Sequence, residues 1–474
     1  MDGGDKSSLL IDKLKRVLEE DHLSENAIKN AISNYSRFIL GENGIISKSN
    51  IKPAEGVLNY SDLENFYGYG EKALSQVAII NLNGGLGTSM GLSSAKSLLK
   101  IKGGETFLSI IVKQVSFFRK KYNVTLPLLF MNSFNTDKDT LASLGSFKNE
   151  NQLPLSFLQN KIRKIDIATL LPVDHPEDRS LEWCPPGHGD IYEAMYQNGI
   201  IKKLLDNGIE YAFISNVDNL GAEIDLNILG YLAKTEIPFL MEVTERTEAD
   251  RKGGHLARNK KNNRLILREL AQCPENEKDE GGDFQNIKKY CYFNTNSLWL
   301  NLRALQELLD ELDGIVYLPL IVNKKNVNPR DENSTPVYQL ETAMGTAISL
   351  FDKSVAVCVP RSRFAPVKST NDLIVLRSDR YDVDSDGTVK ISPDAKGGAG
   401  ISVKLSKHYK KIDDFEERFP AGVPSMIDCE SLIIDGDFLF GANVKFVGNV
   451  HLINKSDKQV QIPAGTICEG KKEY

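Results

Sequence analysis

Apolar residues recur along the first forty positions with the spacing of amphipathic helices. Charged residues fill the positions between them, and the apolar set is Leu9, Leu10, Leu14, Val17, Leu18, Ile28, Ile32, Tyr35 and Phe38. Residues 8–40 therefore predict a small helical lead-in, which we expect to be a packing element without chemistry. Residues 41–60 are polar and contain Pro53, so we expect a linker-like passage across the surface.

From about residue 76 to residue 375, short apolar runs alternate with helical patterns. The runs expected to be strands are residues 77–80, 97–101, 126–131, 154–158, 211–214 and 238–243. Helical patterns lie between them, after Thr106, at 191–206 and at 225–234. Strands that are apolar throughout and separated by helices predict a mostly parallel sheet covered on both faces. In such a sheet, ligands bind beyond the carboxyl ends of the strands.

Beyond about residue 376 the pattern changes to short, closely spaced apolar runs. These are residues 432–434, 438–440, 444–447, 450–453 and 460–462, with turns such as 435–437 and 463–465 between them. Repeated short strands indicate the coils of a parallel β-helix, and a small β-sandwich is the alternative. We expect three parts, residues 1–75, 76–375 and 376–474. The end of such a solenoid is also a candidate surface for self-association.

Composition narrows the class of protein. The chain has 474 residues, of which 41% are hydrophobic and 26% charged, and its net charge of -6 argues against a general nucleic-acid binder. No apolar stretch reaches the 18 or so residues of a membrane span, and no signal-peptide pattern follows the first residues. Six cysteines are scattered without metal-ligand spacing. We therefore expect reduced thiols, a cytoplasmic location, and neither nucleic acid nor membrane as a partner.

The first chemical feature is a glycine-rich loop that follows the strand at 77–80. Glycines stand at 84, 85, 87 and 91, and Lys96 closes the segment. Glycine lets a backbone approach a bulky anion, and successive backbone N–H groups can then point at phosphate oxygens. The loop lacks the Gly-Lys-Ser/Thr ending of a P-loop and the third glycine of the dinucleotide fingerprint. A glycine-rich turn without a ligand is the alternative.

Two further segments follow the loop along the chain. Residues 185–190 read Pro-Pro-Gly-His-Gly-Asp, in which stiff prolines and small glycines present His188 either as a hydrogen-bond donor to phosphate or as a base. Residues 216–219 read Asn-Val-Asp-Asn after an apolar strand. Asp218 is there either a Mg²⁺ ligand, because hard cations prefer carboxylate oxygen, or a cap of the next turn.

Three more positions carry polar or charged side chains that suit ligand recognition. Gln159 follows a strand, and its amide can both donate and accept hydrogen bonds. Residues 294–296, Asn-Thr-Asn, place short polar side chains between apolar strands, which suits hydroxyl groups, although an asparagine-rich turn is the alternative. Residues 361–368 carry Arg361, Arg363 and Lys368, which can balance phosphate charge or form a solvated basic loop.

Several of these strings together resemble the eukaryotic-type UDP-glucose pyrophosphorylase family. They are Leu-Asn-Gly-Gly-Leu-Gly-Thr-Ser-Met-Gly from residue 82, Pro-Pro-Gly-His-Gly-Asp from residue 185, and Ser-Asn-Val-Asp-Asn-Leu-Gly from residue 215. The resemblance covers nearly the whole chain, and the order of the motifs makes it specific. One departure is visible: the family usually has proline before the loop lysine, where this chain has Ala95.

The resemblance implies a fold and a reaction. The fold is α/β, with a mixed, mostly parallel central sheet of Rossmann-like nucleotidyltransferase type, and a C-terminal left-handed parallel β-helix. Residues 76–375 would be the catalytic domain. The reaction is UTP plus glucose 1-phosphate giving UDP-glucose plus pyrophosphate, reversibly, with Mg²⁺. Two alternatives are an enzyme of the same fold for other UDP-sugars or UDP-N-acetylhexosamine, and a nucleotide-sugar sensor without turnover.

The resemblance also implies a role for each matching residue. Nucleotide-binding residues would be Leu82, Asn83, Gly84, Gly85, Lys96, Gln159, Gly187, Asn216, Asp218 and Lys368. Gln159 and Gly187 would read the uracil, and Lys96 and Lys368 would be catalytic. Asp218 would hold the metal. The sugar phosphate would be held by His188, Asn294, Thr295 and Asn296.

Overall fold

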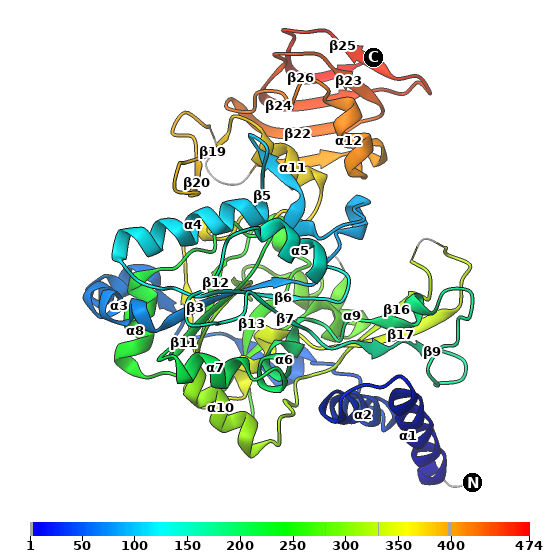
Figure 1. Cartoon of the computed structure of the whole chain (residues 1–474). Helices are drawn as coiled ribbons and strands as arrows, with labels where there is room; N and C mark the ends of the chain where they lie inside the picture. Colours follow the sequence, from blue (N-terminus) through cyan, green and yellow to red (C-terminus); the bar gives the residue numbers. More distant parts are fainter. Residues whose placement is uncertain (1–2, 280, 330, 397–400) are drawn as a thin grey trace.

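The N-terminal helices, the central α/β body and the C-terminal coils follow one another along the molecule (Figure 1). The computed structural model describes residues 3–279, 281–329, 331–396 and 401–474. Within these ranges no helix combines the length and the apolar character that a membrane crossing requires. None of the six cysteines, all of which lie in the described ranges, forms a disulfide.

The central sheet is mixed and mostly parallel, as the alternation of strands and helices predicts. Its order is β2 (Leu58–Asn59), β18 (Val355–Cys358), β12 (Phe239–Glu245), β15 (Tyr292–Asn301), β11 (Tyr211–Asn216), β3 (Val77–Asn83), β6 (Leu128–Asn132) and β7 (Ser156–Leu158). All neighbours pair in parallel except β15, which is antiparallel to both β11 and β12. A branch at one side adds β1 (Ile51–Pro53), β13 (His255–Asn259) and β14 (Leu265–Arg268).

Alternation along β3 explains why both faces of this sheet are covered. Val77 and Ile79 pack into the core beneath α4 (Phe107–Tyr122) and α8 (Leu226–Thr235). Ala78, Ile80 and Leu82 pack into the opposite core, with α6 (Ile191–Gln197), α7 (Ile200–Asp206) and α10 (Leu302–Glu311). Figure 1 shows α4 on one side of the strands and α6, α7 and α10 on the other. A strand apolar at every position requires these two cores, because successive side chains point to opposite faces.

Two local expectations differ from the structure. The helical pattern at 191–206 is broken between α6 and α7, where Gly199 takes a positive φ of 65°; only glycine adopts that conformation without cost. The strand expected at 97–101 is shorter. A 3₁₀ turn, η5 (Lys96–Leu98), precedes β4 (Lys100–Lys102), which pairs with β5 (Glu105–Thr106).

The helical lead-in is confirmed as α1 (Gly3–Glu20) and α2 (Glu25–Ile39), the latter capped by Ser24. Their apolar faces pack on a small sheet of β9 (Ile165–Asp166), β17 (Pro336–Glu341) and β16 (Ile321–Asn326). The linker that follows is tied down by the antiparallel pairing of β1 with β13. Remaining elements of the body are α3 (Tyr67–Ala73), α5 (Asp137–Leu144), β8 (Ile162–Arg163), β10 (Trp183–Cys184) and α9 (Glu275–Lys278).

The C-terminal part is built from parallel coils, which confirms the β-helix rather than the sandwich. One face is β21 (Ser402–Leu405), β22 (Cys429–Asp435), β24 (Lys445–Ile453) and β26 (Ile467–Glu473), and another is β23 (Phe438–Phe440) with β25 (Val460–Ile462). All of these pairs are parallel. Phe438, Phe440 and Phe446 fill the interior, and α12 (Ile412–Arg418) packs against β23.

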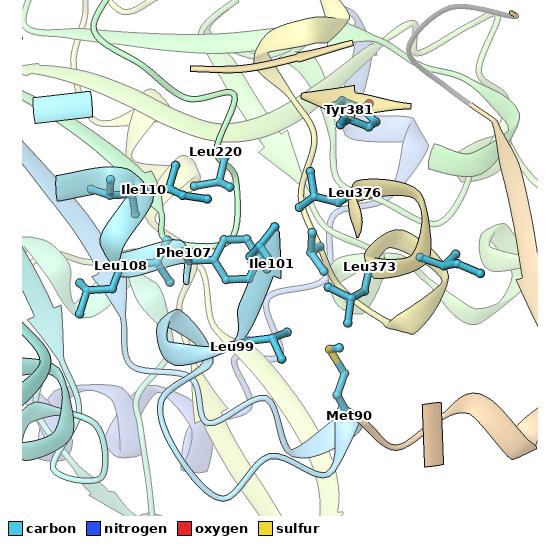
Figure 2. Close-up of a cluster of buried hydrophobic side chains, with 14 of the residues drawn as sticks. Met90, Leu99, Ile101, Phe107, Leu108, Ile110, Leu220, Leu373, Leu376 and Tyr381 are labelled. Carbon is cyan, nitrogen blue, oxygen red and sulfur yellow. The ribbon is translucent and has the colours of Figure 1, made fainter. Parts of the chain in front are cut away.

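A continuous core joins the coils to the sheet. Figure 2 shows Leu373 and Leu376, from α11 (Thr370–Arg377), facing Met90 of the glycine loop and Leu99 and Ile101 of the segment that follows it. Tyr381 of the hairpin β19 (Tyr381–Val383) and β20 (Val389–Ile391) completes the cluster. α11 runs across the expected boundary at 375/376, and the division into 1–75, 76–375 and 376–474 stays a prediction.

Candidate active site

Polar residues at the ends of neighbouring strands share one edge of the central sheet. Asn216 lies opposite Leu82 in the β11–β3 pair, and Asn83 lies opposite Asn132 in the β3–β6 pair. The backbone N–H of Gln159, which follows β7, donates to the carbonyl of Asn132 at 2.9 Å. Strand ends that are far apart in the sequence therefore meet, as the pattern of parallel strands predicts.

Gln159 lies against the first glycine of the loop. A Cβ on Gly84 would come within 2.7 Å of the amide nitrogen of Gln159, whereas one on Gly85 would meet nothing within 4 Å. The loop closes on itself where the N–H of Lys96 donates to the carbonyl of Gly85 at 3.1 Å. A side chain at 84 would displace the neighbouring amide from its position, and the open side at 85 leaves room for a ligand.

Ala95 has the backbone conformation that proline would impose. Its φ is -55° and it is fully buried, and the ring of proline fixes φ near -65°. The loop therefore reaches Lys96 along the path that the family's proline would set.

Lys96 and Asp218 face each other across the sheet edge. Nζ of Lys96 donates to Oδ2 of Asp218 at 2.6 Å, and both side chains are mostly buried. The second carboxylate oxygen of Asp218, Oδ1, is buried and has no hydrogen-bond partner among the described residues. A buried anionic oxygen without a partner is costly, so this atom is available for a ligand that brings positive charge or a donor.

The basic run at 361–368 is fastened to the segment that carries Asp218. The side-chain amide of Asn219 donates to the carbonyl of Arg363 at 3.1 Å and accepts from the N–H of Ala365 at 2.9 Å. The N–H of Val367 then donates to the carbonyl of Asp218 at 3.1 Å. Lys368 therefore follows directly after a residue bonded to Asp218, although 150 positions separate the two in the sequence.

Lys368 is exposed at the edge of this site, beside two groups that the sequence motifs did not identify. Its Nζ lies 5.8 Å from the ring centroid of Phe293. Burial raises the pKa of the Glu269 carboxyl, and the positive charge of Lys368 opposes that rise, so the two groups are within electrostatic reach. Gly253 and Gly254 pack against Phe293 and Glu269 so closely that a Cβ would clash. The two consecutive glycines at 253 and 254 were the available signal in the sequence that other groups approach the backbone closely here.

The Pro-Pro-Gly-His-Gly-Asp segment is held by the strand end of β17. The N–H of Thr342 donates to the carbonyl of Pro186, and the N–H of Gly189 donates to the carbonyl of Thr342, each at 2.9 Å. Gly187 has φ of 84°, and a Cβ there would lie 2.4 Å from the carbonyl oxygen of Thr342. Both its φ and its surroundings therefore require glycine.

His188 is placed as a neutral hydrogen-bond donor. Its Nδ1 accepts from the N–H of Met344 at 3.1 Å, and burial lowers its pKa to about 4. In the neutral ring the remaining proton is then on Nε2. The donor role weighed from the sequence is the one that this geometry favours over a base.

We therefore expect His188 to show the Nε2–H tautomer from pH 5 to 8. Imidazole ¹H–¹⁵N spectra of protein labelled at histidine measure this directly, with the signal assigned by its loss in His188→Gln. The titration midpoint should lie near pH 4, because desolvation disfavours the charged ring. A midpoint near the ordinary histidine value, or a proton on Nδ1, would contradict the donor geometry.

Residues 294–296 form a bulge in β15 rather than a free turn. The register of β12 and β15 shifts between Glu242 and Val243, and Asn296 takes φ of 59°. The side chains of Asn294 and Asn296 bond each other at 2.8 Å. A Cβ on Gly345, next to the Met344 that holds His188, would lie 3.0 Å from the amide nitrogen of Asn294, so the bulge and the histidine loop are neighbours.

Two predicted side chains are engaged inside the protein. The amide of Asn83 donates to Asn132 and to Thr140, both at 2.8 Å. The hydroxyl of Thr295 donates to the backbone carbonyl of Glu242 at 2.7 Å. Asn83 and Thr295 are thus fixed by neighbours in the sheet. Only their backbone groups and the free lone pairs of their side-chain oxygens remain for contacts to a ligand.

A mixed α/β sheet whose strand-end edge carries a glycine loop, a lysine–carboxylate pair and a second lysine defines a nucleotide-dependent transferase. A family model described as UTP–glucose-1-phosphate uridylyltransferase matches residues 27–446. The chain belongs to this family, and it is an enzyme of this activity, a nucleotidyltransferase that makes UDP-glucose from UTP and glucose 1-phosphate.

Several relatives match along most of their length. The UTP–glucose-1-phosphate uridylyltransferase of Hordeum vulgare is 38% identical over 96% of this chain and 94% of its own. A probable enzyme of the same name from Schizosaccharomyces pombe is 39% identical, covering 88% of this chain and 80% of its own.

Solved structures agree with the fold. That of a UDP-glucose phosphorylase from Trypanosoma brucei has a TM-score of 0.91 and 41% identity, covering 98% of this chain and 99% of that one. A mutant UDP-glucose pyrophosphorylase from Leishmania major, solved in complex with UDP-glucose, has a TM-score of 0.90 and 38% identity, with the same coverage.

Proposed function

We propose that uridylyl transfer takes place at the edge of the central sheet between the glycine loop and the bulge of residues 294–296. A phosphate oxygen of glucose 1-phosphate attacks the α-phosphorus of UTP, the bond to the β-phosphate oxygen breaks, and pyrophosphate leaves. The attacking oxygen is already anionic, so no general base or covalent enzyme intermediate is needed. Positioning of the two anions and neutralisation of their charge therefore carry the catalysis.

The nucleotide is held on the β3 and β7 side. In this assignment the backbone from Leu82 to Gly85 and the strand end at Asn216 contact the nucleotide. Gln159 and Gly187 read the edge of the uracil. The close packing of Gly84 on the amide of Gln159 supports the role of Gln159 in reading the uracil, because it places this amide beside the nucleotide loop. An amide can match both a donor and an acceptor of the base.

Replacing Gln159 by alanine is expected to weaken UTP binding and to relax the preference among nucleoside triphosphates. The missing amide leaves the uracil edge unpaired, which costs on the order of 1–3 kcal/mol for a buried polar group. KM values for UTP, CTP and ATP measure the change, and Gln459→Ala in the exposed part of the C-terminal coils is the control. Unchanged selectivity would remove Gln159 from the uracil site.

Charge on the phosphates is balanced by Lys96, Lys368 and Mg²⁺ held by Asp218. The described residues contain no cluster of three or more metal-ligating side chains. Mg²⁺ in nucleotide sites, however, is commonly held by one or two carboxylates together with substrate phosphates and waters. The unpartnered Oδ1 of Asp218 fits that role. When bound, the ion would neutralise phosphate charge and orient the phosphate oxygens.

The sugar phosphate is held on the opposite side of the cleavage point. Nε2–H of His188 donates to its phosphate, and the 294–296 bulge, with Asn294, Thr295 and Asn296, contacts the sugar phosphate. Two contacts support this: His188 is hydrogen-bonded to the N–H of Met344, and the next residue, Gly345, packs against the amide of Asn294. Glu269, beside Lys368, is a further acceptor for hydroxyl groups on this side.

One observation carries the proposal: the segment ending in Lys368 is bonded to the carbonyl of Asp218, whose carboxylate meets Lys96. The chain segments that carry the two predicted cations and the predicted metal ligand therefore meet at this edge of the sheet, which supports the assignment. Pyrophosphate release from UTP with a panel of sugar 1-phosphates tests the substrate, and UTP formation from UDP-glucose and pyrophosphate tests the reverse direction. We expect glucose 1-phosphate to be the best acceptor. Binding of UDP-glucose without either reaction would identify a sensor instead.

A further inference from the structure

A buried ion pair lies beneath the site and touches both of its halves. The guanidinium of Arg363 makes two hydrogen bonds to the carboxylate of Glu242, at 2.8 and 2.7 Å. The Glu242 side chain is fully buried and that of Arg363 is 12% exposed. Trp299 also donates to Glu242 from its indole nitrogen, at 2.8 Å. Glu242 interrupts the apolar run of β12. A charged carboxylate in a buried strand requires a partner of opposite charge, and Arg363 is that partner.

One half of the site is the segment that ends in Lys368. Arg363 stands at the start of that segment, and its backbone carbonyl accepts from the amide of Asn219. Asn219 also accepts from Ala365, so its side chain pairs with the segment as a strand backbone would. The Arg363 guanidinium is thus fixed to Glu242 in the sheet, and it also donates to the carbonyl of Glu223 at 2.8 Å and lies 3.8 Å from the Asp225 carboxylate. The Arg363 carbonyl is fixed to the residue next to Asp218.

The other half is the bulge at 294–296. The backbone carbonyl of Glu242 accepts from the hydroxyl of Thr295, and the register shift that forms the bulge occurs at Glu242. A single residue thus holds the lysine segment through its side chain and the bulge through its main chain. Stability alone does not explain this pair, because a buried ion pair is often no more stabilising than well-packed apolar residues.

We propose that Arg363, Glu242 and Asn219 form a brace that positions Lys368 against the bulge. The three are positioning residues, since they act through groups that touch the substrates. The inference rests on the proposed function, in which two anions must be aligned for an in-line attack. A misplacement of about 1 Å at such a centre can lower turnover by about 10²-fold, which explains why two rigid connections converge on one segment.

The first test is Arg363→Lys. Lysine keeps the charge but cannot form the paired hydrogen bonds of a guanidinium. We expect kcat to fall by about 10²-fold and KM for UTP to stay within about threefold, because the uracil side is held by β3 and β7. The matched control is Arg303→Lys: Arg303 makes two hydrogen bonds of 2.6 Å to Glu210, which precedes β11 at the end opposite the site. That variant should keep its kcat.

A second test separates positioning from stability. The double variant Glu242→Gln/Arg363→Met removes the two charges of the Arg363–Glu242 pair and keeps an acceptor for the indole of Trp299. The carboxylate of Asp225, 3.8 Å from Arg363, keeps its hydrogen bonds from Tyr60 and from two backbone N–H groups at the start of α8. We expect a melting temperature close to that of the unmodified protein, with kcat still about 10²-fold lower. A stable double variant with normal kcat would overturn the brace. If it does not fold, Asn219→Ala, which removes only the side-chain clamp, must show the same split between kcat and KM for UTP.

The third test asks whether Arg363 acts through Lys368. In a Lys368→Ala background, Arg363→Lys should lower kcat by less than about threefold further, because neighbours that share one function are not additive. Full additivity would mean that Arg363 acts elsewhere and would overturn the proposal. Failure of the brace is distinct from failure of the proposed function: the latter is seen in the unmodified protein, as absence of UDP-glucose formation.

Discussion

We expect Lys368→Ala to lower turnover by about 10²–10³-fold while the protein keeps its fold. The transition state concentrates charge on the α-phosphate, between nucleophile and pyrophosphate. A single cation is worth most there once the bound substrates have displaced water from the reacting groups. The structure supplies the fixed position that this requires. Val367 is bonded to the carbonyl of Asp218, and the N–H of Lys368 itself donates to Asp372 at 2.8 Å, where α11 begins.

The side chain of Lys368 contributes little to folding. It is exposed, and exposed substitutions away from caps and cores usually change stability by less than about 0.5 kcal/mol. The rate at saturating substrates, measured beside a thermal melting curve, separates the two effects. Lys368→Arg should recover little, since the guanidinium is larger and planar. Lys353→Ala, an exposed lysine before β18, is the control. A near-native rate for Lys368→Ala would leave neutralisation to Lys96 and the metal.

Asp218→Asn is expected to lower turnover by at least about 10²-fold in both directions. Asparagine keeps the shape of the side chain and can cap a turn as well as aspartate. It lacks the charge that a hard cation requires, and it no longer forms an ion pair with Lys96, 2.6 Å away. The reaction of the unmodified protein should depend on Mg²⁺ in both directions, and that of the variant should require much more Mg²⁺ for any activity.

The measurement is a Mg²⁺ titration of the rate, with urea unfolding of both proteins beside it. The loss in turnover should far exceed the loss in stability, because the Asp218 side chain keeps its volume and its neighbours. Asp386→Asn, in the hairpin turn between β19 and β20, is a control that should keep the Mg²⁺ response. Full activity of Asp218→Asn at limiting Mg²⁺ would show that this carboxylate is only a cap.

Much of the fold could be predicted because its strands carry a strong local signal. Four apolar residues at 77–80, followed by asparagines and glycines, define β3 and its loop whatever the rest of the chain does. The break at Gly199 and the turn at 96–98 were missed because the local signal there is weak. A helical or extended pattern of apolar residues is compatible with a local interruption, and only the packing of the segment decides where it falls.

The sequence predicted individual residues of the candidate site better than the contacts between them. Gln159, His188 and Asp218 were predicted as site residues because they follow strands or stand in rigid loops. Glu269 lacked such a context, although the paired glycines at 253 and 254 signal a close approach. Glu242 gave a clearer signal, since a carboxylate within an apolar strand requires a buried partner. Sequence alone could not name that partner, because Arg363 is 121 positions away.

The sequence by itself determined the periodicity of the strands and helices, the polar residues that follow the strands, and the glycine-rich composition of the loops. These depend on a few neighbouring positions, whose spacing fixes the backbone and the face that each side chain takes. The tertiary structure alone decided that Lys96 meets Asp218, that Asn83 and Thr295 turn inward, and that the Lys368 segment is fastened by Asn219. Such contacts depend on the register between segments far apart in the chain, which is set by hydrogen bonds and packing across the whole sheet.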